Sequence, residues 1–184
     1  GKEYWQKNRG LIPAVCYGLD RQAIIDAVLL GQGMEAYGPL QRNTYNNEDV
    51  EHYDYNPEKA KEVLEAAGCE MGDDGFYYRD GEKVGFVISV SSGDQVRIDG
   101  TDKGANYSGY SNEKVDEYLT EARESSDPEV RAEAYDKFQV ELANDPAYAF
   151  ICYIDANYVA DSDIHGIDPD TIMGHHGVGI FWNV

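Results

Sequence analysis

The stretch at residues 9–40 most constrains the fold, because two short helical patterns meet there at a single acidic residue. Asp20 can accept a hydrogen bond from the free N–H groups at the start of the second helix. Gly31 and Gly33 predict the end of that helix, since glycine adopts a left-handed exit conformation at little cost. The apolar residues of the helix recur at helical spacing and predict one buried face: Ile24, Ile25, Val28 and Leu29.

Length and charge bound the possible functions. A chain of 184 residues fits one domain and is long enough to bury about 70% of its unfolded surface. Its 35 acidic and 15 basic side chains give a net charge of −20, which repels phosphate backbones, so we expect no nucleic-acid partner. The sequence contains no run of about 18 apolar residues that would span a membrane.

The three cysteines indicate packing rather than chemistry. Cys16, Cys69 and Cys152 lack a Cys-x-x-Cys spacing, so they predict neither a zinc ribbon nor a redox pair. Cys16 lies in a helical stripe and Cys152 in an apolar strand, where a thiol behaves as a small buried hydrophobe.

Three further helices are predicted from polar residues that can cap their first turns. They begin after Asn56, Asn112 and Asp127, and each continues into a helical apolar pattern. Gly68 predicts the end of the first of these helices. The apolar run at residues 148–154 predicts a strand.

A hairpin is predicted between the first and second of these helices. Asp80-Gly81 is typical of a tight turn between two strands. The second strand, residues 84–90, is nearly all apolar, so we expect it to be central in its sheet and covered on both faces. The polar stretch at residues 41–55 has no sustained period and predicts a surface loop.

Taken in order, these signals resemble those of one known family, the extracellular solute-binding proteins of ABC importers called family 5. Members of that family bind oligopeptides, dipeptides or nickel complexes. The resemblance is carried by four segments in the family's order: Arg9 with Tyr17-Gly18-Leu19-Asp20-Arg21, Gly31 and Gly38-Pro39; Tyr55-Asn56-Pro57-Glu58-Lys59-Ala60-Lys61; Gly109-Tyr110-Ser111-Asn112; and Phe150-Ile151-Cys152-Tyr153.

The resemblance implies an α/β fold of the periplasmic-binding-protein-like type 2 class, with a mixed sheet flanked by helices. Residues 1–184 would form a single lobe of a two-lobed protein that closes around its ligand, the larger lobe preceding this region. The resemblance further implies a monomer without a cofactor, a membrane permease of an ABC transporter as partner, and an extracytoplasmic location with a lipid anchor on the parent protein.

The sequence departs from the family between Asp99 and Gly100. Family members carry there a helix and two strands that supply most of this lobe's ligand contacts. Either this segment has been removed from the protein, or the protein has it as an additional stretch of chain between Asp99 and Gly100. We favour the second explanation, because natural strands rarely end so abruptly.

Two residues are predicted to contact the ligand. Tyr153 matches the family's apolar-aromatic strand near the cleft and hinge. Asp155 follows it closely and would supply the carboxylate that a peptide amino terminus needs. A sheet residue beside a turn is the alternative for Tyr153, and a solvated surface acid is the alternative for Asp155.

A resident metal is not predicted. His175 and His176 are adjacent, and neighbouring residues on an extended chain point to opposite faces. Asp161 and Asp163 imitate the start of a calcium loop, but position 12 of that loop is Ile172 instead of the bidentate glutamate that an EF-hand requires. A nickel-complex binder of the same family is therefore a secondary hypothesis.

Catalysis is not predicted either. Cys16 and His165 lack a surrounding nucleophile motif. A carboxylate-dependent hydrolase domain is the alternative from a different functional class, because the many acidic residues can include a catalytic pair.

Overall fold

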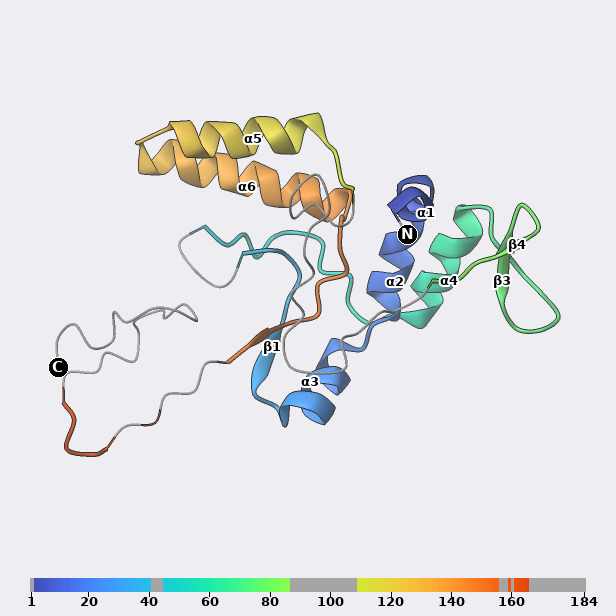
Figure 1. Ribbon diagram of the computed structural model, residues 1–184, viewed down its shortest axis with the longest axis horizontal. Coiled ribbons are helices and arrows are strands. Elements are labelled where there is room, and N and C mark those ends of the chain that lie inside the picture. Colours follow the sequence, from blue (N-terminus) through green and yellow to red (C-terminus); the bar gives the residue numbers. More distant parts are fainter. Residues whose placement is uncertain (1, 41–44, 87–108, 156–158, 160, 166–184) are drawn as a thin grey trace.

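The computed structural model describes residues 2–40, 45–86, 109–155, 159 and 161–165 (Figure 1). Its N-terminal part is a run of helices: α1 (Lys2–Lys7), the 3-10 helix η1 (Arg9–Leu11), α2 (Ile12–Gly18) and α3 (Arg21–Leu29). Asp20 accepts a hydrogen bond of 2.9 Å from the backbone N–H of Ala23 at the start of α3. The predicted meeting of two helices at an acidic cap is confirmed.

The end of α3 differs from the prediction. Leu30 already adopts the left-handed conformation, with φ of 53°, and Gly31 follows with φ of 80°. Gly33 instead begins the strand β1 (Gly33–Glu35) and allows a close approach of backbones, because a Cβ there would lie 2.9 Å from the carbonyl oxygen of Tyr153. Gly33 is therefore needed for strand packing and does not end the helix.

The predicted apolar face of α3 is only partly buried. Ile25 is fully buried, Ile24 and Leu29 are half-buried, and Val28 is 71% exposed. The reason is the small area that α3 covers: it packs on β1 and on β5 (Cys152–Ile154), which together form a two-stranded sheet. A sheet of three-residue strands cannot cover a whole helical stripe.

The described strands form two antiparallel sheets. In the first, Met34 of β1 lies opposite Tyr153 of β5. The second contains β2 (Glu70–Met71), β3 (Tyr77–Arg79) and β4 (Glu82–Lys83), in that order. The α/β class is confirmed, but no parallel pair occurs among the described strands, where a mixed sheet was expected.

The predicted hairpin turn is confirmed. Asp80 and Gly81 have φ of 53° and 79°, the combination that a two-residue type I′ turn requires. The strand after it differs from the prediction, because β4 ends at Lys83 on the edge of its sheet and Phe86 is about half exposed. Residues 87–90 lie outside the described part of the chain.

The other predicted helices are α4 (Pro57–Ala66), α5 (Glu113–Glu124) and α6 (Pro128–Asn144). Each begins after its predicted cap, and the side chains of Asn56, Asn112 and Asp127 accept backbone hydrogen bonds. Helix α4 packs on α2, and α5 forms a helical hairpin with α6 (Figure 1). A buried cluster holds α5 against α6 and the segment that follows them, and its residues are Val115, Phe138, Leu142 and Ala147.

Several sequence predictions fall on residues outside the described ranges. These are the join between Asp99 and Gly100 and the histidine pair at residues 175 and 176. The described part of the predicted surface loop, residues 45–55, contains neither helix nor strand. Among the described helices, none has the length and apolar character to cross a bilayer.

Candidate functional site

The run of residues 17–21 ends in a buried arginine. Arg21 is only 3% exposed, and its Nε donates to the carbonyl oxygen of Phe150 at 2.8 Å. Its Nη1 donates to the carbonyl oxygens of Tyr53 at 2.9 Å and Cys16 at 3.4 Å. The guanidinium of Arg21 thus connects α2, the 45–55 loop and the segment that enters β5. We call this set of contacts the joint.

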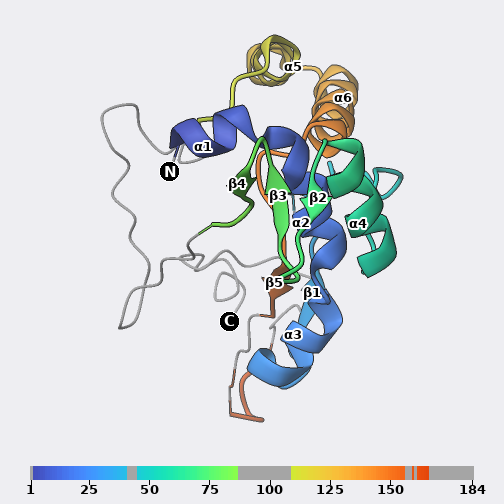
Figure 2. The ribbon, with the colours of Figure 1, turned by 90° about the vertical axis from the view of Figure 1, so that its right-hand side faces the viewer.

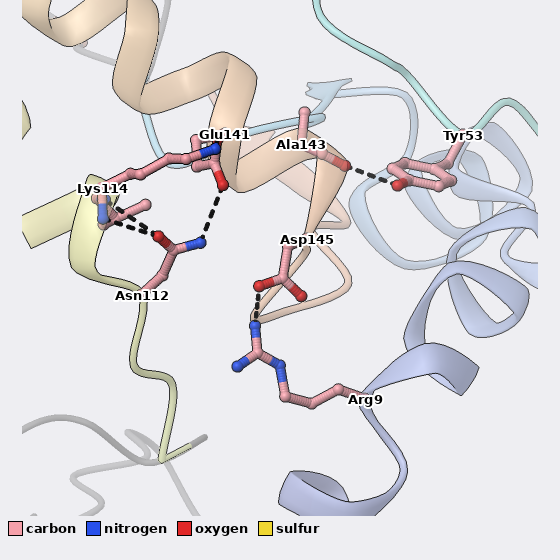
Figure 3. Close-up of polar contacts among 8 residues, drawn as sticks. Arg9, Tyr53, Asn112, Lys114, Glu141, Ala143 and Asp145 are labelled. Carbon is pink, nitrogen blue, oxygen red and sulfur yellow. Dashed lines mark hydrogen bonds and ion pairs between the residues drawn. The ribbon is translucent and has the colours of Figure 1, made fainter.

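Tyr53 extends this joint to the C-terminal helices. Its ring packs edge-on against Tyr17, with ring centroids 5.0 Å apart. Its hydroxyl donates to the carbonyl oxygen of Ala143 near the end of α6 at 2.6 Å (Figure 3). Burial raises the pKa of Tyr53 to about 12, with nearby acidic groups adding to the effect.

We expect the raised pKa of Tyr53 to make the protein less stable in alkali. The unfolded phenol titrates near pH 10, so between about pH 10 and pH 12 the unfolded state loses this proton first and stability falls as pH rises. Because the ring is partly exposed, the loss should be about 2 kcal/mol. Urea unfolding across this range should show a shallower fall in stability for Tyr53→Phe than for the wild type.

Arg9 holds the same end of α6. Its guanidinium forms an ion pair with Asp145, just beyond α6 (Figure 3). It also lies over the ring of Tyr110, 4.5 Å from the ring centroid. Glu141 of α6 accepts a hydrogen bond of 3.1 Å from Asn112. Arg9 therefore holds the end of α6 on the N-terminal helices, and Asn112 holds the start of α5 against α6.

A cavity of about 370 Å³ lies beside this joint, between β1, the 45–53 loop, α6 and β5. The 45–53 loop forms one wall of the cavity, and the buried side chain of Gln139 in α6 holds this loop in place. The amide of Gln139 accepts from the N–H of Asn47 at 2.9 Å and donates to the carbonyl oxygen of Tyr45 at 2.6 Å. The side chains that give the cavity its character are aromatic or acidic: Tyr37, Phe150, Tyr153, His52, Glu35, Glu48 and Asp49.

An aromatic stack forms one wall of the cavity. The rings of Tyr37 and His52 are parallel within 6°, with centroids 4.0 Å apart. The hydroxyl of Tyr37 donates to the carboxylate of Glu35, and Arg21 lies 5.4 Å from the ring centroid of Tyr37. Burial, followed by Glu35, raises the pKa of Tyr37 to about 12. The sequence analysis did not single out Glu35 or His52, whereas Arg21 and the turn at residues 37–40 were noticed without being assigned to a site.

Tyr153 and Asp155 are placed differently. Tyr153 lines the cavity, and its hydroxyl lies 2.6 Å from the carbonyl oxygens of both Gly38 and Leu40. Asp155 lies just beyond β5, is exposed, and is not among the residues that line the cavity. The hydroxyl of Tyr153 holds the turn after β1, so its ring is the part that faces the cavity.

We expect Tyr153→Phe to lower the free energy of unfolding by about 1 kcal/mol, the usual net contribution of one hydrogen bond. The loss should appear as a decrease of about 2–4 °C in Tm. Tyr148→Phe, at an exposed tyrosine, is the control and should leave Tm unchanged. Equal Tm values for Tyr153→Phe and the wild type would show that the hydroxyl does not stabilise the turn.

A resident metal site is not seen in the described ranges, which contain no group of three or more His, Cys, Asp or Glu side chains arranged to hold an ion. Asp161 instead accepts a hydrogen bond of 3.0 Å from the backbone N–H of Asp163, as in an ordinary turn. Cys16 is buried, and burial raises the pKa of its thiol to about 11, which disfavours the thiolate form that a nucleophile requires.

Comparison with known proteins decides the family. Residues 7–102, more than half of the chain, match the profile of bacterial extracellular solute-binding proteins, family 5, in its middle part. The chain belongs to this family. The resemblance read from the sequence is thus confirmed.

Several known proteins are similar to different lengths of the chain. Protein XP55 of Streptomyces lividans is 28% identical over 215 residues, which cover 83% of this chain and 39% of XP55. The oligopeptide-binding protein AppA of Bacillus subtilis is 36% identical over 97 residues, covering 50% of this chain and 18% of AppA. The dipeptide-binding protein of Escherichia coli is 42% identical over 60 residues, 32% of this chain and 11% of that protein.

Solved structures of similar proteins support the periplasmic-binding-protein-like fold. NikZ from Campylobacter jejuni, solved in complex with Ni(L-His), superimposes with a TM-score of 0.75 at 25% identity and covers 97% of this chain. Bacillus subtilis AppA, in complex with a nonapeptide, gives a TM-score of 0.65 at 21% identity and covers 80% of this chain. The chain spans 48% of NikZ and 42% of AppA, less than half of either protein.

Proposed function

We propose that residues 1–184 form one lobe of a solute-binding protein that captures peptides for an ABC importer. The match of residues 7–102 to family 5 carries this proposal. The names of two relatives, an oligopeptide-binding and a dipeptide-binding protein, favour peptides as the ligand. Capture would come from closure, in which a ligand that bridges two lobes stabilises the closed state through its higher affinity for it.

On this lobe, Tyr153 and Asp155 remain the proposed ligand contacts. The ring of Tyr153 lines the cavity beside β5, and its hydroxyl is engaged with the turn after β1. We therefore assign the ring, and not the hydroxyl, to ligand contact. Asp155 is exposed at the end of the same strand, where its carboxylate is accessible to a peptide amino terminus.

A nickel complex is the second candidate ligand. It is favoured by NikZ, whose structure contains Ni(L-His) and whose fold covers 97% of this chain. The described residues do not form a cluster of metal ligands. In this candidate role, nickel would arrive as a complex that carries its own ligands, like the Ni(L-His) in the NikZ structure, and the lobe would recognise the organic part.

We expect the isolated chain to bind peptides only weakly, because a closing cleft needs both lobes. Calorimetry should detect no peptide binding with a Kd tighter than about 1 μM. Intact AppA titrated with a nonapeptide is the positive control, and Ni²⁺ with and without L-histidine tests the second candidate. Tight peptide binding by these 184 residues would show that one lobe is sufficient and would contradict the proposal.

The remaining properties follow from the same proposal. The parent protein would be monomeric, held outside the cytoplasmic membrane by a lipid anchor, and would deliver its ligand to a membrane permease. It would not catalyse a reaction. Turnover of peptides or glycosides by the purified chain would instead support the carboxylate-dependent hydrolase hypothesis, and a natural precursor without an export signal would contradict the proposed location.

A further inference from the structure

The cavity of about 370 Å³ beside β5, which we call the β5 cavity, borders one face of the small sheet. Strands β1 and β5 lie side by side next to α3 (Figure 2). A Cβ at Gly33 would lie 3.1 Å from the side chain of Leu29 in α3, and successive residues of a strand point to opposite faces. Met34 and Tyr153, which lie opposite each other, therefore point away from α3. Both of them line the β5 cavity.

The aromatic rings of the β5 cavity are held in place by contacts of their own. The hydroxyl of Tyr153 is bound to the turn after β1, which leaves the ring to face the cavity. The imidazole of His52 stacks on Tyr37, and its Nε2 lies 3.0 Å from the carbonyl oxygen of Glu48. The face of an aromatic ring attracts a cation. Rings that are already ordered lose little conformational freedom when a ligand binds to them.

The charges on the cavity lining are negative. Its described lining residues include Glu35, Glu48 and Asp49 but no lysine or arginine. Arg21 lies behind the cavity, 5.4 Å from the ring centroid of Tyr37. Its guanidinium is buried and is already bound to three backbone carbonyl oxygens.

The titration of Tyr37 shows which sign of charge dominates at this wall. Burial comes first among the causes that raise the pKa of Tyr37 to about 12, followed by Glu35 and then Asp54. Arg21 acts in the opposite direction and offsets these effects only in part. The phenol thus lies where an added negative charge is disfavoured, and the same surroundings favour a positive charge.

We propose that the β5 cavity binds a positively charged side chain of the ligand, a guanidinium or an ammonium group, and so gives this lobe a preference for basic peptides. The ring of Tyr153 would contact the cation, and the carboxylates of Glu35 and Asp49 would balance its charge. The volume lies within the range of about 300–1,000 Å³ that is usual for small-molecule sites. The chain's net charge of −20 would raise the local concentration of cationic ligands. This inference rests on the proposed function for the peptide nature of the ligand.

Amino-acid derivatives test the charge preference on the chain as it is, without a second lobe. N-acetyl-arginine amide, N-acetyl-lysine amide and N-acetyl-glutamine amide are titrated separately into the ¹⁵N-labelled chain, and their Kd values are measured from NMR shifts. The blocked ends carry no charge, so the probes differ only in their side chains. We expect both basic probes to bind several-fold more tightly than the glutamine probe. The shift changes should include the backbone amides of Glu35 and Asp49.

Two variants separate the cavity from the general field of the protein. Glu35→Gln removes one charge but keeps an oxygen that can accept from the hydroxyl of Tyr37. It should weaken both basic probes several-fold and leave the glutamine probe unchanged. Glu65→Gln removes the same charge from an exposed position on α4 and should leave all three Kd values unchanged.

Three results would overturn the charge preference: equal Kd values for the three probes, an equal loss of affinity in Glu35→Gln and Glu65→Gln, or shift changes confined to residues outside the β5 cavity. Each of them would leave peptide capture standing. Release of acetate or ammonia from a probe, which the same NMR samples would reveal, would instead contradict the proposed function, because that function involves no catalysis.

Discussion

Replacing Arg21 with alanine should lower the free energy of unfolding by about 3 kcal/mol or more. The guanidinium donates to the carbonyl oxygens of Phe150, Tyr53 and Cys16, and the side chain is 3% exposed. A buried carbonyl that loses its donor costs about 1–3 kcal/mol unless water replaces it. Urea unfolding followed by circular dichroism measures this loss. Helices lie both in the N-terminal part and in the α5–α6 hairpin, so the helical signal reports the unfolding of each.

Two further variants separate the role of this arginine from a general effect of charge. Arg21→Lys keeps the charge but loses the planar fork that reaches several acceptors, so it should retain little of the stability. Arg123→Ala removes an exposed arginine from α5 and should change stability by no more than about 0.5 kcal/mol. A loss below about 1 kcal/mol for Arg21→Ala would show that the joint tolerates water in place of the guanidinium.

The features that the sequence predicts well are decided within a few residues. A cap such as Asp20 or Asn56 acts on an N–H group three residues away, and the Asp80-Gly81 turn depends only on the backbone preferences of its own two residues. These features do not depend on contacts with residues far away in the sequence. Helix starts and the hairpin turn were accordingly placed correctly.

The features that the sequence does not predict depend on distant partners. The burial of Arg21 requires the carbonyl oxygen of Phe150, and the exposure of Val28 follows from the small sheet beneath α3. No local pattern distinguishes a helix face that meets a three-residue strand from one that meets a wide sheet. Periodicity therefore predicts that a helix is amphipathic but not how much of its apolar face is covered.

The candidate site shows the same division. Tyr153 was singled out through the family resemblance, and it lines the cavity; its contact with a ligand stays a prediction. Gln139 and His52 were not found, because a glutamine on a helix and a histidine in a polar loop are both typical of solvated positions. Their positions result from contacts between α6, the 45–55 loop and Tyr37, which lie far apart in the sequence.

Replacing Phe138 with alanine should destabilise the protein by about 3–5 kcal/mol, the range for a large aromatic residue removed from a core. Phe138 is 8% exposed and contacts the cluster that holds α5 against α6, together with Val115 and Leu142. Neighbouring side chains can fill only part of the space left by the ring. The measurement is the urea midpoint and slope for the wild type and the variant.

Two variants of the same helix test whether this loss comes from packing. Phe138→Leu retains most of the apolar volume and should cost less than Phe138→Ala, about 1.5 kcal/mol. Val140→Ala, at a position that is 42% exposed, should change stability by about 0.5 kcal/mol or less.

Because Tyr53 and Arg9 tie the end of α6 to the N-terminal helices, the hairpin and those helices should unfold in one transition. A variant in which α5 and α6 unfold first, at a lower urea concentration, would show that these two contacts do not couple them.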